Sequence, residues 1–131
     1  MQIRSEPAIP PMDTHFGVQL FQTHAAELAR RIGRPFPPFA VIDVRPPAAF
    51  ARGRVPGSVS ASTESIVDRL PEGVGPETEV FVVGAGTEDR DRRRAALALR
   101  AHGVRRVVEV TGGMVEWMGR KLPVESGGTT A

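Results

Sequence analysis

The sequence predicts a three-layer α/β/α domain built on a central parallel sheet of about five strands. Two short apolar runs, at 39–44 and 80–83, have the length and composition of strands buried on both faces of a sheet. Segments with apolar residues at helical spacing separate the strand-like runs, and this alternation is typical of parallel sheets. At 131 residues, the chain has room for one such domain with one core.

Turn-forming residues and apolar periodicity place each element in order. Thr23 is predicted to cap the first helix, and Gly33 to end it, because the prolines that follow prevent its resumption. Gly103 is the predicted stop of the longest helix. The predicted strands are 17–21, 39–44, 58–61, 80–83 and 107–110; the predicted helices are 23–31, 46–53, 62–70, 92–102 and a short one after 112–113.

The chain divides into three expected parts. Residues 1–15, with three prolines, form a loose N-terminal lead-in. The domain itself spans 16–124, and the glycine- and threonine-containing tail at 125–131 is expected to fray.

Composition excludes several classes of function. The absence of cysteine excludes disulfides, thiolate metal sites and thiol redox chemistry, and the three histidines show no metal-ligand spacing, so no metal is expected. The net charge of +2 is too small to imply a nucleic-acid partner. No apolar stretch approaches the roughly 20 residues of a membrane helix, and the N-terminus lacks a signal-peptide core. We therefore expect a cytoplasmic protein with no membrane or nucleic-acid partner, of bacterial-type composition.

The sharpest charge cluster is the run Arg-Asp-Arg-Arg-Arg at 90–94. One interpretation is a phosphate-binding patch. The other, which we favour, is the solvated first turn of a helix, because no aromatic residues interleave the run to stack bases.

Two stretches carry the motifs of a known family. The first is the apolar run that ends in Asp-Val-Arg at 43–45, followed by Gly-Arg-Val-Pro-Gly-Ser at 53–58. The second starts with the strand-like run at 79–83 and ends in Gly-Gly-Met-Val-Glu-Trp at 112–117 and Leu-Pro-Val at 122–124. Over roughly residues 39–124 the chain resembles the rhodanese-like domain family, with an arginine at 54 where the family usually has histidine. The resemblance implies the rhodanese fold.

The resemblance also places Gly84 where the family has its nucleophilic cysteine. In the family, that cysteine takes up sulfur as a persulfide, in a loop whose backbone N–H groups stabilise an anion together with the dipole of the following helix. Glycine has no side chain and can hold neither a thiolate nor a persulfide. Thr87, the nearby hydroxyl, lacks a histidine or lysine base. No catalytic residue is therefore expected.

The loop at 84–90 remains the expected binding site, because working loops of open parallel sheets lie at the carboxyl ends of strands. The carboxylates of Glu88 and Asp89 would each oppose an anion bound in the loop by about 1 kcal/mol or more. The alternative interpretation is that these two residues form a catalytic pair, one acid and one base. Arg90 stands one place later than the arginine of the family's Cys-x-x-x-x-Arg, closer to a phosphatase-type loop. The expected binding loop consists of Gly84, Ala85, Gly86, Thr87, Glu88, Asp89 and Arg90.

Four residues outside the loop are expected to support it. Asp43 and Arg45 end the first buried strand, and we expect them to form a structural brace. The resemblance implies that they help to hold the loops at the active-site end of the sheet. Gly112 and Gly113 allow the chain to approach the loop closely. Trp117 is expected to anchor the last helix to the sheet.

The sequence therefore predicts a catalytically degenerate rhodanese-like domain without a cofactor, which binds a partner protein or a small anionic ligand over the loop. If Glu88 and Asp89 face solvent, the partner's patch should be basic. One alternative is a component of a sulfurtransferase pathway in which a cysteine on another chain carries the sulfur. The other is an enzyme that handles anions or phosphate esters through Arg90.

Overall fold

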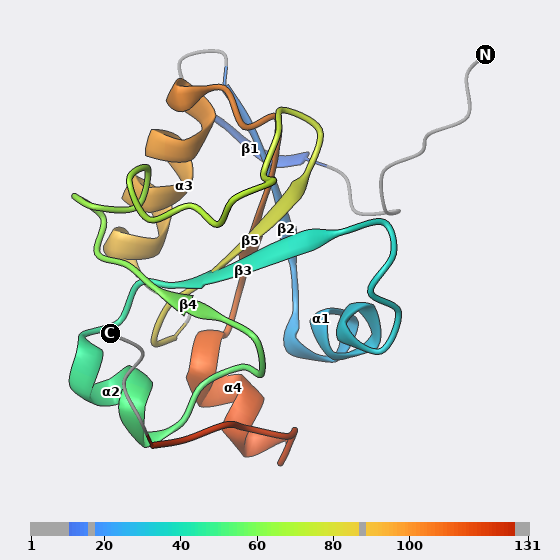
Figure 1. Cartoon of the computed structure of the whole chain (residues 1–131), viewed down its shortest axis with the longest axis vertical. Coiled ribbons are helices and arrows are strands. Elements are labelled where there is room, and N and C mark those ends of the chain that lie inside the picture. Colours follow the sequence, from blue (N-terminus) through green and yellow to red (C-terminus); the bar gives the residue numbers. More distant parts are fainter. Residues whose placement is uncertain (1–10, 16–17, 87–88, 128–131) are drawn as a thin grey trace.

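The computed structural model describes residues 11–15, 18–86 and 89–127, which form one six-stranded sheet with helices on both faces (Figure 1). The strands are β1 (Pro11–His15), β2 (Val18–Thr23), β3 (Phe39–Asp43), β4 (Val59–Ser60), β5 (Glu79–Val83) and β6 (Arg106–Val110). The helices are α1 (Ala25–Ile32), α2 (Pro47–Arg52), α3 (Arg90–His102) and α4 (Gly113–Gly119).

The strand order is β1-β2-β6-β5-β3-β4, and the five strands from β2 to β4 pair in parallel, whereas β1 pairs antiparallel with β2. The predicted fold class is thus confirmed: a central parallel sheet of five strands between two layers of helices. The central strand β5 is buried along its whole length, as expected for a run of apolar residues covered on both faces.

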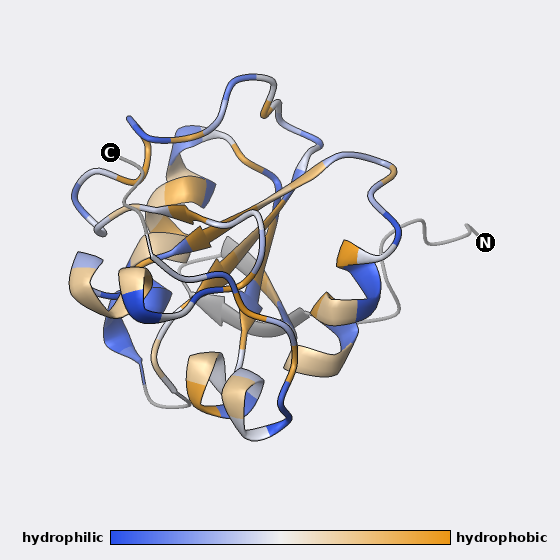
Figure 2. Cartoon of the chain, turned by 60° about the horizontal axis from the view of Figure 1, so that its bottom comes forward, coloured by the Kyte–Doolittle hydropathy of each residue, from blue (hydrophilic) through white to orange (hydrophobic). Residues whose placement is uncertain are grey.

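Each face of the sheet has its own cluster of buried side chains. On one face, Ile42, Val80 and Val82 pack with Ala96 and Leu99 of α3. The other cluster lies under α1 and α4 and contains Ala25, Leu28, Phe81, Met114 and Trp117. Figure 2 shows the strongly hydrophobic strands in the interior and hydrophilic segments on the outer parts of the helices. Trp117 is 2% exposed and donates its indole N–H to the carbonyl of Pro123 at 2.8 Å.

The register aligns the strand ends. Asp43 pairs with Val83, and Val83 pairs with Val110, so β3, β5 and β6 end in one row. The segments that follow these strands therefore meet at the carboxyl edge of the sheet, where ligand sites of open parallel sheets lie.

Three local predictions differ from the structure. Residues 11–15, expected in the lead-in, form β1, because their backbone pairs with β2. Residues 62–70 were predicted as a helix, but they form hydrogen-bonded turns instead. There, the Ser62 hydroxyl accepts the backbone N–H of Ser65 at 3.2 Å and the Ser65 hydroxyl accepts that of Ser62 at 3.1 Å. Such local bonds compete with helix formation.

The third difference is at the start of α1. Its N-cap is His24 without a side-chain bond, and the hydroxyl of the predicted cap, Thr23, is buried and has no hydrogen-bond partner among the described residues. The carboxylate of Glu116 in α4 accepts the N–H of Ala25 at 3.3 Å instead. A distant acceptor, which no local pattern reveals, thus replaces the predicted cap.

The expected tail at 125–131 is tied down where it begins. Glu125 and Arg54 exchange two backbone hydrogen bonds of 2.9 and 3.0 Å, and the N–H of Gly127 donates to Ala51 at 2.8 Å. Residues 1–10 and 128–131 lie outside the described residues. No helix in the described part of the chain is long and apolar enough to cross a membrane.

Candidate functional site

The loop after β5 starts with Gly84, which is buried at the carboxyl edge of the sheet. Its carbonyl accepts the N–H of Met114, and the carbonyl of Ala85 accepts that of Val115, both at 3.0 Å. Because the first N–H groups of a helix have no partners within it, the loop and the start of α4 satisfy each other's backbone. The loop is thus fixed to α4.

Asp89 turns its carboxylate into this loop. It is the N-cap of α3, and one carboxylate oxygen accepts the N–H of Arg92 at 3.0 Å. The other oxygen accepts the N–H of Ala85 at 2.7 Å. The backbone N–H groups that could bind an external anion, at the start of α3 and in the loop, thus bind the carboxylate of Asp89 instead.

The Asp89 carboxylate also occupies the space of a side chain at position 84. A Cβ added to Gly84 would overlap the Asp89 carboxylate and lie 2.6 Å from its Cγ. The Cβ of Arg92 would be 3.3 Å away. The position that the family resemblance assigns to a cysteine is therefore filled by a neighbouring acid.

Gly112 and Gly113 lead into α4 with φ angles of +80° and +54°, a region that glycine adopts without steric cost. A Cβ on Gly113 would lie 2.5 Å from the Gly84 carbonyl oxygen and 2.7 Å from the carbonyl carbon of Ala85. Glycine at 113 is thus what allows α4 to contact the loop.

Asp43 and Arg45 lie beside the loop and bind each other. Asp43 is fully buried, and Arg45 donates to its carboxylate from Nη2 at 2.8 Å and from the backbone N–H at 2.9 Å. Nη2 of Arg45 also donates to the carbonyl of Gly53 at 2.6 Å. The pair ties the end of β3 to the end of α2.

The basic run at 90–94 is not a uniformly solvated turn, as its favoured interpretation held. Arg92 is 5% exposed and donates from Nε to the fully buried carboxylate of Glu109 at 3.0 Å. Its Nη1 donates to the Gly86 carbonyl at 3.1 Å. Arg93 contacts the same Glu109 carboxylate at 3.0 Å. The correction arises because Glu109, inside the valine-rich strand β6, draws both guanidinium groups toward the sheet.

The expected binding residues are thus distributed differently from the prediction. Asp89 faces inward because it caps α3, so the condition under which we expect a basic patch on the partner is not met at this residue. Ala85 and Arg90 are exposed. Thr87 and Glu88 lie outside the described residues.

Two apolar side chains of α4 are exposed, and one of them, Val115, adjoins the loop; they were not predicted as a surface from the sequence. Val115 is 72% exposed and Met118 is 44% exposed. A Cβ on Gly86 would lie 3.8 Å from a methyl group of Val115, so the side chain borders the loop directly. The sequence could have indicated this surface, because residues 115 and 118 share one face of the helix whereas Met114 and Trp117, which are buried, share another. We call Ala85, Val115 and Met118, together with Arg90, the loop surface.

The chemistry of the site follows from these contacts. The described loop residues supply no thiol or hydroxyl nucleophile, and the N–H groups of Ala85 and Arg92 are bound to Asp89. No group of three or more potential metal ligands occurs among the described residues. What the site presents to a ligand is therefore a fixed backbone with an apolar and basic outer surface.

Comparison with known proteins agrees with this geometry. The sequence model of the rhodanese-like domain matches residues 24–120. The crystal structure of the Alr3790 protein from Anabaena sp. superimposes with a TM-score of 0.71 and 28% identity, over 80% of each chain. The solution structure of the rhodanese-like domain of the same protein gives a TM-score of 0.68 and 28% identity, over 80% of this chain and 78% of that one.

A structure from Bacillus halodurans, the BH2092 protein, has a TM-score of 0.69 and 25% identity, over 80% of this chain and 76% of that one. No curated protein matches the chain.

Proposed function

Because the chain belongs to the rhodanese-like domain family, and because it has no cysteine, we propose that it is a catalytically degenerate member that acts by binding a partner protein at the loop surface. The observation that carries this proposal is the position of the Asp89 carboxylate. It overlaps the place of a side chain at 84 and accepts one backbone N–H of the loop, that of Ala85, and one of α3, that of Arg92.

The same observation favours a protein over a small anion as the ligand. A free oxyanion would have to displace a carboxylate that is tethered beside the N–H groups it needs, and tethering gives a ligand a high effective concentration. An anion bound next to Asp89 would also experience repulsion from it. A protein partner needs neither the thiol nor the anion position.

The loop surface indicates what such a partner presents. Val115 and Met118 offer exposed apolar area, and Arg90 adds a positive charge at the start of α3. Because Asp89 faces inward, we expect an apolar patch with an acidic residue on the partner, in place of the basic patch that outward carboxylates would require.

A pull-down from extract of the source cells tests the proposal, with the wild-type chain and Val115→Glu as baits. Val115 is largely exposed, so the substitution leaves the core intact. We expect a partner whose recovery falls at least about fivefold with Val115→Glu, because a charge in an apolar contact is desolvated without compensation. The control is Glu72→Lys, an exposed change in the connection before β5. Equal recovery of every protein by all three baits would refute the loop surface as the binding site.

A further inference from the structure

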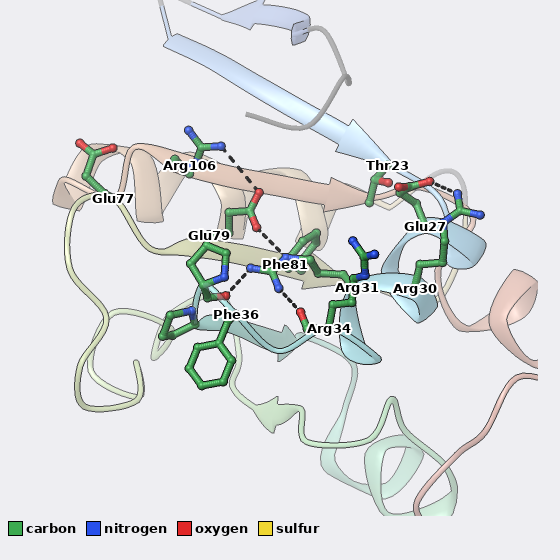
Figure 3. A pocket seen from close by; sticks show the side chains of 12 residues that line it. Thr23, Glu27, Arg30, Arg31, Arg34, Phe36, Glu77, Glu79, Phe81 and Arg106 are labelled. Carbon is green, nitrogen blue, oxygen red and sulfur yellow. Dashed lines mark hydrogen bonds and ion pairs between the residues drawn. The ribbon is translucent and has the colours of Figure 1, made fainter. Parts of the chain in front are cut away.

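A hollow lies on the α1 face of the sheet, separate from the loop surface (Figure 3). It has a volume of about 750 Å³, with Phe81 of β5 among its apolar residues. Its rim is formed by the end of α1, the segment 33–38, and the first residues of β5 and β6. Since the loop at 84–90 follows the carboxyl end of β5, this rim lies at the opposite end of the strand.

The charges in this hollow do not balance. Four arginines and three glutamates line it. Glu27 pairs with Arg30, and Glu77 pairs with Arg105 at 3.1 Å. The carboxylate of Glu79 alone faces two guanidinium groups, those of Arg31 at 3.1 Å and Arg106 at 3.8 Å. Because Arg105, which does not line the hollow, neutralises Glu77, these pairs leave one positive charge in excess before Arg34 is counted.

Arg34 adds a second positive charge. Within the described residues it has no ion-pair partner, and it is exposed at the rim of the hollow. Arg31, by contrast, is fixed: it donates to the carbonyls of Arg34 and Pro37 and lies 4.4 Å above the ring of Phe39. The hollow thus contains one arginine held in place by its contacts, Arg31, and one exposed arginine at its rim, Arg34, whose charge is available to an anionic ligand.

Phe36 connects this hollow to an apolar one. Its side chain is 80% exposed, and it lines both the large hollow and a neighbouring hollow of about 400 Å³. Pro38 also lines both, and the smaller hollow is otherwise lined by apolar side chains and glycine, such as Ile32, Phe39 and Val41. The two hollows are therefore neighbours that share Phe36 and Pro38, one basic and the other apolar; together we call them the α1 groove.

A buried hydroxyl lies in the same groove. Thr23 is 5% exposed and lines the large hollow, and its Oγ1 has no hydrogen-bond partner within the described residues. A buried hydroxyl without a partner costs about 1 to 3 kcal/mol. A polar group of a ligand that enters the hollow beside Thr23 would remove this cost.

We propose that the α1 groove binds an extended segment of a partner protein that carries acidic residues next to a bulky apolar side chain. The acidic residues would pair with Arg34 and Arg106, and the apolar side chain would pack against Phe36 and the smaller hollow. Arginine and aromatic side chains around a hollow are the residues that dominate binding at protein interfaces. The proposal is independent of the loop surface, since none of its residues is shared.

The glutamates argue against a nucleic acid as the occupant. Glu27, Glu77 and Glu79 would lie along a backbone with one phosphate per nucleotide and repel it, and Phe36 is the only large aromatic side chain exposed among the described residues. A peptide can place its few carboxylates at the arginines alone.

Fluorescence anisotropy with the full chain tests the proposal. The probe is a short fluorescein-labelled peptide that alternates glutamate with leucine, and the reference is the same peptide with lysine in place of each glutamate. We expect the acidic peptide to bind, and the affinity to fall at least about tenfold with either Arg34→Glu or Phe36→Ser. Both residues are exposed, so the fold is preserved.

Two control variants separate this groove from the other surface. Arg52→Glu makes the same charge change on an exposed residue of α2, and Val115→Glu alters only the loop surface. Both should bind the acidic peptide as the wild type does. The proposal is refuted if the acidic peptide does not bind, if the lysine peptide binds as well, or if all variants bind equally. Tighter binding of a single-stranded oligonucleotide than of the acidic peptide also refutes it.

Discussion

At the scale of single residues, Asp89 has two roles that normally belong to different groups. It caps α3 through Arg92, and it satisfies the N–H of Ala85 inside the loop. In an anion-binding loop the second role would belong to a bound ligand. Loss of the Asp89 side chain would therefore affect both α3 and the loop.

Asp89→Ala should lower the free energy of unfolding by about 1 to 2 kcal/mol, because an N-cap is lost and a loop N–H loses its acceptor. Urea denaturation measures the change. Asp91→Ala is the matched control, since Asp91 is an exposed acid in the first turn of α3 and does not cap it. Equal effects of the two variants would contradict the assigned role of Asp89.

Gly84→Cys should not produce a sulfurtransferase. The new side chain would overlap the Asp89 carboxylate, and that charge would raise the pKa of the introduced thiol, because it disfavours the thiolate. We expect no thiocyanate from thiosulfate and cyanide above the wild-type background, and a less stable protein. Turnover together with a thiol pKa below about 8.5 would show that the loop still accepts the chemistry.

At the scale of elements, the contact between α4 and the loop depends on one glycine. Gly113→Ala should destabilise the fold by about 2 kcal/mol or more. The added Cβ would lie 2.5 Å from the carbonyl oxygen of Gly84, and φ of +54° costs an alanine about 1 kcal/mol.

The same helix offers the control. A Cβ on Gly119 meets nothing within 4 Å, so Gly119→Ala should be neutral or stabilising by about 0.5 to 1 kcal/mol. Thermal unfolding of both variants measures the difference. If Gly113→Ala unfolds at the wild-type temperature, α4 does not need its close approach to the loop.

The link between α3 and β6 is a buried charge cluster. Glu109→Leu leaves the buried guanidinium of Arg92 without this carboxylate, so we expect a loss of about 3 kcal/mol or more in chemical denaturation. Glu77→Gln removes an exposed ion pair with Arg105 and should cost less than about 1 kcal/mol. Similar losses in both variants would mean that burial does not determine how much this charge cluster contributes to the free energy of unfolding.

At the scale of the whole molecule, the chain keeps the architecture of its family without the family's nucleophile. We expect no thiosulfate:cyanide sulfurtransferase activity from the wild-type chain, because no side chain can hold the transferred sulfur. Colorimetric detection of thiocyanate is the measurement, with a reaction without protein as the reference. A rate well above that reference would overturn the view that the domain is catalytically degenerate.

The architecture was predictable because it rests on features that are local in sequence. Local patterns directly indicate which residues are buried: the apolar runs of β3 and β5, and the helical spacing of apolar residues before Gly103. Aspartate is a preferred N-cap, so its bond to Arg92 follows a local rule, but its second bond, to the N–H of Ala85, was not predictable. The link from Glu109 to Arg92 and the support of α1 by Glu116 join residues far apart in the chain, and no local pattern encodes such pairs.

The overlap between residue 84 and Asp89 also bears on how such a protein can evolve. A cysteine gained at 84 while Asp89 remains would be crowded and poorly ionised, and loss of Asp89 while glycine remains at 84 would weaken the start of α3. Each single step is unfavourable, although the two together could be tolerated, which is the pattern of two coupled sites. We therefore expect a functional thiol at 84 to be acquired only together with a change at 89, because neither substitution is tolerated well without the other.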